Sequence, residues 1–180
     1  MSQKNHKADV TPPYIFFNGE LVPWEQATVH VWSETAIRAI NVFEGLRAYW
    51  HEGENRWYLR AWRQHFDRLM QSARIMRIPH SYSFEDFDQG ISSLLNALPY
   101  REHLYVRPTI YIERGRYGFR PEDVKTGMHI AAFPVGGAEE AIRSLRVRVS
   151  TWRRSGDLDA PPRIKAGPNY HNLRLAQIEA

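Results

Sequence analysis

The sequence predicts an α+β fold, and two observations support this. Segments with β-strand patterns come first, two stretches of helical periodicity follow, and β-type segments then return. The chain has 180 residues, of which 43% are hydrophobic and 13% aromatic, so it can bury a core of ordinary domain size. This order of elements is typical of α+β or mixed α/β domains.

The chain is expected to open with a β-hairpin. The run "YIFFNGELVPW" holds two β-prone stretches around Asn18-Gly19, a dipeptide that tolerates the positive φ angles of a tight turn. A short helix is expected near "SETAIRAI". The strand "NVFEGLRAYW" follows, and it continues as "RWYLR" after the turn "HEGEN". Alternation along this strand puts Phe43 and Gly45 on one face and Glu44 on the other.

Two amphipathic helices are expected next. Apolar residues recur at helical spacing and form one stripe that should pack against a sheet, namely Trp62, Phe66, Leu69, Ala73 and Met76. In "SFEDFDQGISSLLNALP", Ser83 is a candidate N-cap followed by acidic residues in the first turn. A second helix should therefore begin just after Ser83.

Three β-rich segments come after the helices: "HLYVRPTIYIERG", "MHIAAFPVG" and "LRVRVSTW". The polar, proline-rich stretch "RRSGDLDAPPR" is the candidate domain boundary. Beyond it, "NYHNLRLAQIEA" has helical spacing without a glycine or proline stop signal. We therefore expect the chain to be part of a larger protein.

Composition argues against several classes of function. The net charge of +4 comes from 24 basic and 20 acidic residues spread along the chain, so no nucleic-acid partner is expected. The absence of cysteine excludes disulfides and thiolate chemistry and is compatible with a cytoplasmic protein. The eight histidines lack metal-ligand spacing, so no metal site is expected. No apolar run approaches membrane-spanning length, and no membrane association is expected.

Lys165 is the main candidate for chemistry. It is one of four lysines among the 24 basic residues, and it lies between "PPRI" and an Ala-Gly pair. Desolvation disfavours the charged form of an amine, and a neutral amine can attack an aldehyde to form a Schiff base. An exposed loop lysine is the alternative, which spacing alone does not exclude.

The wider pattern around Lys165 resembles a known family. The segment "IKAGPNYHNLRLAQIEA" is similar to the lysine segment of fold type IV pyridoxal-phosphate enzymes of the branched-chain aminotransferase family. The stretches "FFNGELVPWEQATVHV", "VFEGLRAY", "HFDRL" and "YVRPTIY" resemble, in the same order, its opening hairpin, first active-site strand, phosphate-contacting helix and substrate-side strand. The resemblance runs from about residue 14 to residue 180.

The resemblance implies roles for individual residues. Lys165 would bind pyridoxal 5′-phosphate covalently and move a proton between cofactor and amino acid. Tyr170 would hydrogen-bond the phenolic oxygen of the cofactor, and Arg68 would bind its phosphate. The residues expected around the substrate are Phe43, Gly45, Tyr105, Arg107, Trp152 and Arg38.

Each role has a plainer alternative from the residues alone. Arg68 could be a solvated arginine on an amphipathic helix. Tyr105 and Arg107, which share a strand face with Thr109, could belong to an ordinary polar sheet face. Trp152 could be a core tryptophan.

Two positions depart from the family pattern. Arg38-Ala39 stand where close relatives of the branched-chain enzymes have Tyr-Gly, which suggests altered specificity, such as a more polar or acidic substrate. Pro168 stands where the family often has a small residue.

The function implied is transamination between an L-amino acid and a 2-oxo acid such as 2-oxoglutarate, by a homodimer. Alternatives are D-amino acid aminotransferase, aminodeoxychorismate lyase of the same fold, or a non-catalytic binding module. The expected division is a disordered leader over 1–12, a small α/β domain over 13–152, a connector over 153–162 and the start of a large cofactor-binding domain over 163–180. Most of that large domain is expected to be missing.

Overall fold

A single antiparallel sheet organises the computed structural model, which describes residues 11–114, 120, 123–135 and 147–180. Its strands are β1 Tyr14–Phe17, β2 Glu20–Pro23, β3 Asn41–Phe43, β4 Leu46–His51, β5 Arg56–Leu59, β6 Leu104–Arg114 and β7 Lys125–Pro134. The strand order is β2-β1-β7-β6-β4-β5, and β3 also pairs with β6. All the described pairings are antiparallel. The α+β prediction is confirmed.

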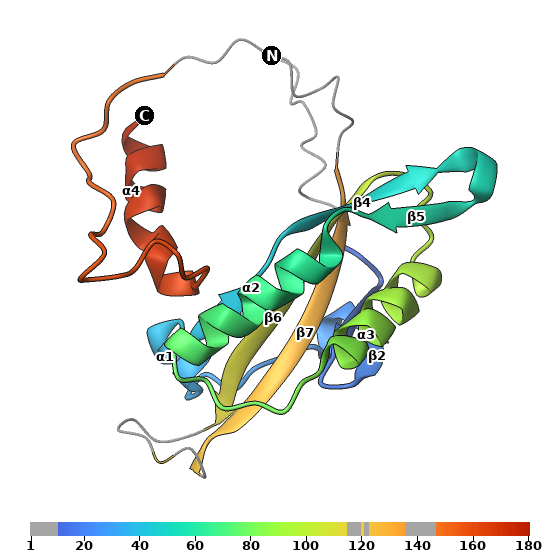
Figure 1. Ribbon diagram of the computed structural model, residues 1–180, viewed down its shortest axis with the longest axis horizontal. Coiled ribbons are helices and arrows are strands. Elements are labelled where there is room, and N and C mark those ends of the chain that lie inside the picture. The colour runs from blue at the N-terminus through green and yellow to red at the C-terminus, as the bar shows by residue number, and fades with distance from the viewer. Residues whose placement is uncertain (1–10, 115–119, 121–122, 136–146) are drawn as a thin grey trace.

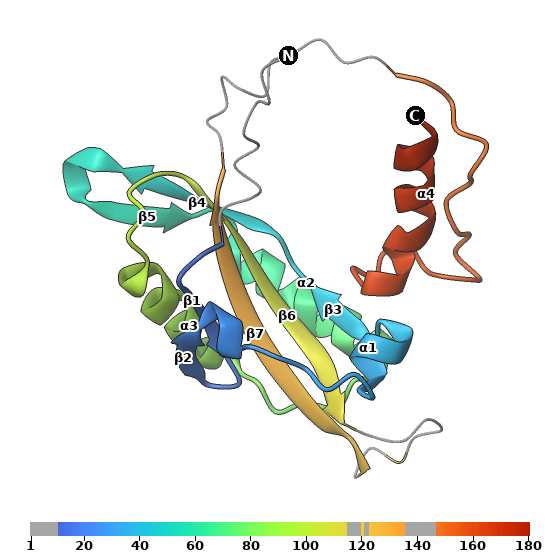
Figure 2. The same ribbon diagram turned by 180° about the vertical axis from the view of Figure 1, so that it is seen from behind.

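Two long helices, α2 Trp62–Ile75 and α3 Phe84–Ala97, cover one face of this sheet (Figure 1). The other two α-helices of the described residues are the short α1 Glu34–Arg38 and α4 His171–Glu179. Seen from behind, strands β6 and β7 lie in front of α2 and α3, and α4 stands apart from the sheet (Figure 2). The core fills the layer between the sheet and these two helices.

The predicted apolar stripe of α2 faces this core. Trp62, Phe66, Leu69 and Ala73 are buried, and Met76, at the end of the helix, is partly buried against the core. Even-numbered residues of β6, such as Val106 and Ile110, are buried against the same layer. Odd-numbered residues of β6 therefore project from the opposite face of the sheet, as the alternation predicts.

Local signals set the turns and helix ends where the sequence places them. Asn18 and Gly19 have φ angles of 51° and 97° and close the β1-β2 hairpin. Ser83 and Asp86 form a reciprocal capping box at the start of α3, because each side chain accepts a hydrogen bond from the backbone of the other. Ser33 caps α1 in a similar way by accepting from the Ala36 N–H.

The expected strand at "LRVRVSTW" is wrong over the part that the structure describes. Residues 147–152 form no strand, and Val147 and Val149 are 88% and 95% exposed. Alternating valines favour a strand only when a sheet edge lies beside them. Here the segment instead contacts Glu179 of α4, through the side chains of Arg148 and Ser150.

The division of the chain into domains stays a prediction. Of the expected leader, residues 1–10 lie outside the described part, as do 136–146 within the expected small domain. None of the described helices is long and apolar enough to cross a membrane. The described residues also hold no cluster of three or more His, Cys, Asp or Glu side chains able to bind a metal ion.

Candidate active site

The backbone of Lys165 is held on both sides. Its N–H donates to the Ser72 hydroxyl on α2 at 3.2 Å, and its carbonyl accepts from the Phe43 N–H on β3 at 3.0 Å. The next residue, Ala166, is fully buried and forms an isolated β-bridge with Val42. The lysine is thus fixed between α2 and the edge of the sheet, although it follows a proline-rich connector.

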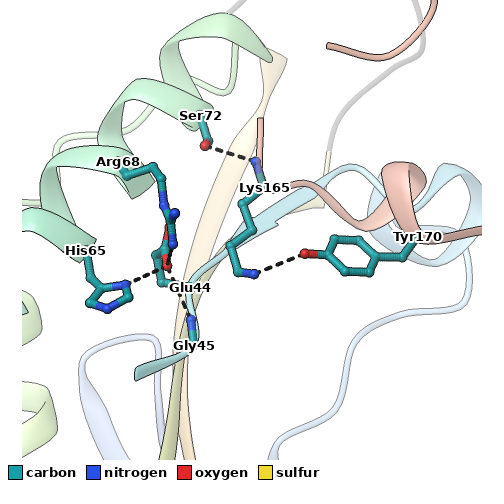
Figure 3. Close-up of polar contacts among 7 residues, drawn as sticks. All are labelled: Glu44, Gly45, His65, Arg68, Ser72, Lys165 and Tyr170. Atoms are coloured by element: carbon teal, nitrogen blue, oxygen red, sulfur yellow. Dashed lines mark hydrogen bonds and ion pairs between the residues drawn. The ribbon is translucent and has the colours of Figure 1, made fainter. Parts of the chain in front are cut away.

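A short turn places an aromatic hydroxyl beside the lysine amine. The 3₁₀ turn Gly167–Tyr170 begins with Pro168 near its start, where the restricted φ angle of proline suits such a turn. The Lys165 Nζ lies 3.0 Å from the Tyr170 hydroxyl (Figure 3). The same Nζ lies 5.1 Å from the ring centroid of Phe43. The rings of Phe43 and Tyr170 are in contact, with centroids 5.2 Å apart. The structure thus brings the predicted site residues Lys165, Tyr170 and Phe43 together, and their roles remain predictions.

Arg68 is paired with the carboxylate of Glu44, which is not among the site residues predicted from the sequence. Its Nε and Nη2 donate to the two carboxylate oxygens of Glu44 at 2.5 and 2.6 Å. The Nδ1 of His65, one turn earlier on α2, lies 2.8 Å from the same carboxylate (Figure 3). Glu44 is fully buried, whereas the Arg68 side chain is half exposed. The signal for this network in the sequence is a glutamate on the core-facing side of an otherwise apolar strand.

The network favours the charged forms of Glu44 and Arg68. Burial alone would raise the pKa of Glu44, but hydrogen bonds and charge from Arg68 and His65 hold that pKa below its usual value. The hydrogen bond to Glu44, together with its charge, raises the pKa of Arg68. Figure 3 shows Arg68 and Tyr170 on opposite sides of the Lys165 side chain in this view. Ser72, which binds the Lys165 backbone, lies one helical turn after Arg68.

Pro108 explains why the strand that carries Glu44 is interrupted between β3 and β4. The Glu44 N–H donates to the Pro108 carbonyl at 2.9 Å. Proline has no N–H, so the second hydrogen bond of this antiparallel pair cannot form. At the next residue, a Cβ on Gly45 would lie 2.3 Å from the Tyr105 hydroxyl. Gly45 therefore makes room for the Tyr105 side chain.

Tyr105, Arg107 and Thr109 project from the face of β6 opposite the helices, together with Phe43 of the neighbouring β3. The Arg107 guanidinium lies over the Phe43 ring, 3.9 Å from its centroid. Among the described residues, Arg107 has no carboxylate within salt-bridge distance. Phe43 thus contacts both Arg107 and Lys165, and the arginine is available to an anionic ligand.

Two further predicted site residues have other surroundings. Arg38, at the end of α1, donates through Nη1 to both carboxylate oxygens of the buried Glu34 at 2.8 Å. Trp152 is 49% exposed and makes no ring contact with another aromatic side chain in the described ranges. A role for either residue at the substrate remains a prediction.

Comparison with known proteins identifies relatives for nearly the whole chain. Residues 41–180 match the model of the family described as amino-transferase class IV. The branched-chain-amino-acid aminotransferase of Escherichia coli K12 is 36% identical over 175 residues. A probable branched-chain-amino-acid aminotransferase of Aquifex aeolicus is 30% identical over 167 residues. Each alignment covers 93% of this chain but 54% of the relative, so the chain spans about half the length of these proteins.

Solved structures agree with these relatives. The branched-chain amino acid aminotransferase from Thermobaculum terrenum, in its PLP-form, superimposes with a TM-score of 0.82 at 35% identity. That alignment covers 94% of this chain and 55% of the other. The T.th. branched-chain amino acid aminotransferase with pyridoxamine 5′-phosphate gives a TM-score of 0.85 at 29% identity, covering 96% of this chain and 57% of the other. The described fold is therefore that of the corresponding half of these structures.

Proposed function

Since the chain belongs to the class IV aminotransferase family, we propose that it supplies part of the active site of a pyridoxal-phosphate-dependent aminotransferase. The reaction is transfer of an amino group between an L-amino acid and a 2-oxo acid. The activity is proposed for a protein of the relatives' full length that contains this chain. The main supporting observation is the 3.0 Å contact between the Lys165 amine and the Tyr170 hydroxyl, on a backbone fixed to α2 and β3.

The donor groups of the site fit pyridoxal phosphate. The Lys165 amine lies 3.0 Å from the Tyr170 phenol, and Figure 3 shows the Arg68 guanidinium on the other side of the lysine; these groups match the aldehyde, the phenolic oxygen and the phosphate of that cofactor. When bound, the cofactor supplies an aldehyde that takes up the amino group and a ring that accepts electron density from the α-carbon. The Thermobaculum terrenum structure is in its PLP-form, and the T.th. structure contains pyridoxamine 5′-phosphate.

The residues of this chain would divide the remaining work. The Nζ of Lys165 would hold the proton that moves to and from the α-carbon of the substrate. The Tyr170 hydroxyl accepts a hydrogen bond from Nζ and so orients the amine. Arg68 would bind the phosphate. Arg107, stacked on Phe43, would bind the substrate carboxylate, with Tyr105 beside Gly45 at the same strand pair.

Labelling of Lys165 tests this proposal. The full-length protein that contains this chain is incubated with pyridoxal phosphate and treated with borohydride, which fixes the cofactor to the amine that it has bound. We expect an absorption band in the visible range before reduction and a single modified peptide containing Lys165 after it. Lys165→Ala should remove both signals, with the fold retained by circular dichroism. A colourless protein without label would contradict the proposal and favour a non-catalytic binding module.

The choice of substrates belongs to the same proposal. The relatives' names support branched-chain amino donors, and the resemblance suggests 2-oxoglutarate as acceptor. We infer that Arg38 shifts the preference toward more polar donors, although Glu34 already compensates part of its charge. A panel of amino donors assayed with 2-oxoglutarate tests this. The resemblance also supports a homodimer, which light scattering of the purified protein tests. A cytoplasmic location is proposed on the absence of cysteine alone.

A further inference from the structure

Glu44 has no role in the chemistry proposed above, although Arg68 is arranged around it. We propose that Glu44 is a positioning residue for phosphate binding: its carboxylate fixes the plane of the Arg68 guanidinium and turns the remaining N–H groups toward the phosphate. This inference rests on the proposed function of the site. It assigns Glu44 a role through Arg68 and no direct contact with substrate or cofactor.

The contact between the two side chains fixes a direction as well as a distance. Two roughly parallel N–H···O bonds, from Nε and Nη2, define both the position and the plane of the guanidinium. A guanidinium has five N–H donors, so both donors of Nη1 and one of Nη2 remain. Because the Arg68 side chain is half exposed, one edge is held by Glu44 and another is open to a ligand.

Glu44 is itself held rigidly. It is fully buried, its backbone N–H is bonded to Pro108, and its carboxylate also contacts His65. The ion pair therefore connects α2 to the strand segment that also carries Phe43. The Phe43 N–H binds the Lys165 carbonyl, so the same strand segment positions both the amine and the guanidinium.

Charge and orientation make opposite predictions for the loss of Glu44. A carboxylate beside Arg68 offsets part of the positive charge that would attract a phosphate. Removing it would strengthen phosphate binding if only net charge mattered. If orientation dominates, removing it weakens phosphate binding, because the arginine then spreads over many rotamers. Because the two effects have opposite signs, an experiment can separate them.

Comparing the binding of pyridoxal 5′-phosphate with that of pyridoxal, which lacks the phosphate, distinguishes a loss of Arg68 orientation from a general loss of structure in the site. Dissociation constants for both are measured by absorbance on the full-length protein that contains this chain. For Glu44→Gln we expect the constant for pyridoxal 5′-phosphate to rise roughly 10- to 100-fold, the range seen when residues that orient metal ligands are removed. The constant for pyridoxal should change little. Should Glu44→Gln fold poorly, Glu44→Asp keeps the charge but not the reach, and the same selective loss is expected.

A double-mutant cycle tests whether Glu44 acts through Arg68. Arg68→Lys keeps a positive charge but cannot form the two parallel bonds. In the Arg68→Lys background, Glu44→Gln should add little further loss. Ser83→Ala is the matched control for lost stability, because it removes the cap of α3 outside this network. It should leave the ratio of the two dissociation constants unchanged.

The outcomes distinguish the two proposals. Equal weakening of both ligands by Glu44→Gln, or unchanged or tighter binding of pyridoxal 5′-phosphate, would overturn the positioning role. So would full additivity with Arg68→Lys. If borohydride labels the wild-type protein at Lys165 but Glu44→Gln leaves the ratio of the two dissociation constants unchanged, the Glu44 proposal alone is refuted. A wild-type protein that binds neither ligand refutes the proposed function and this inference with it.

Discussion

At the level of single residues, His129 on β7 is kept neutral by its surroundings. Its Nδ1 is enclosed and has no hydrogen-bond partner in the described part of the chain. Burial, and to a smaller extent the charge of Arg107, lower the pKa of His129 from 6.5 to about 4. Arg107 is the same side chain that is proposed to bind the substrate carboxylate.

This shift predicts a dependence of stability on pH. The unfolded chain takes up a proton at His129 near pH 6.5, whereas the folded chain does so only near pH 4. The neutral imidazole therefore contributes stability that is complete above pH 6.5 and is lost as the pH falls toward 4. For His129→Gln we expect the decrease in unfolding free energy across this window to be smaller by up to about 3 kcal/mol.

Urea denaturation of both proteins at several pH values measures this difference. Because the carboxylates of the two proteins are the same, their contribution cancels in the comparison. Parallel pH profiles for wild type and His129→Gln would contradict the prediction.

At the level of helices and strands, the signals that succeeded are local ones. The Asn18-Gly19 turn and the Ser83 cap depend on residues within three positions of each other, so the sequence displays them directly. The network of Glu44 with Arg68 joins residues 24 positions apart, and no local pattern states which side chains meet. The inward position of Glu44 was predictable from alternation, but its partners were not. Similarly, the valines of 147–152 have strand propensity without a sheet edge in the structure.

The end of α1 carries a backbone cost that can be removed. Ala39 terminates this helix in the left-handed region, with φ 56° and ψ 31°. A side chain there costs roughly 1–2 kcal/mol, which glycine avoids at some cost in unfolded-state entropy. We therefore expect Ala39→Gly to raise the unfolding free energy by about 0.5–1 kcal/mol.

The same helix offers a matched control for this substitution. Ala36 is exposed within α1, in right-handed conformation, and Ala36→Gly should lower the unfolding free energy by up to about 1 kcal/mol. Chemical denaturation of the two variants gives both values. If Ala39→Gly lowered the unfolding free energy as Ala36→Gly does, the left-handed strain at Ala39 would be smaller than the entropy that glycine adds to the unfolded chain.

Across the chain as a whole, the helices and strands differ in how extensively they contact the sheet. Strands β6 and β7 pair along almost their full lengths at the centre of the sheet, and α3 packs over β1 and β7. Helix α4 has no buried residue, and polar groups connect it to the segment 148–153. The lysine segment fixes this C-terminal part to the sheet and to α2.

This asymmetry predicts the pattern of amide hydrogen exchange in the 180-residue chain. A nine-residue helix is marginal alone in water, and opening α4 exposes no buried side chain. Opening α3 instead uncovers a face that includes Phe87, Ile91 and Leu94. The amides of α4 should therefore exchange roughly 100-fold faster than those of α3, and β6 should be protected at least as well as α3.

The amides of Lys165 and Ala166 should exchange as slowly as those of the core, because the Lys165 N–H is bonded to Ser72 and Ala166 is fully buried. If α4 were protected to the same degree as β6, the chain would be a single cooperative unit, and the lysine segment could not be treated as its point of attachment.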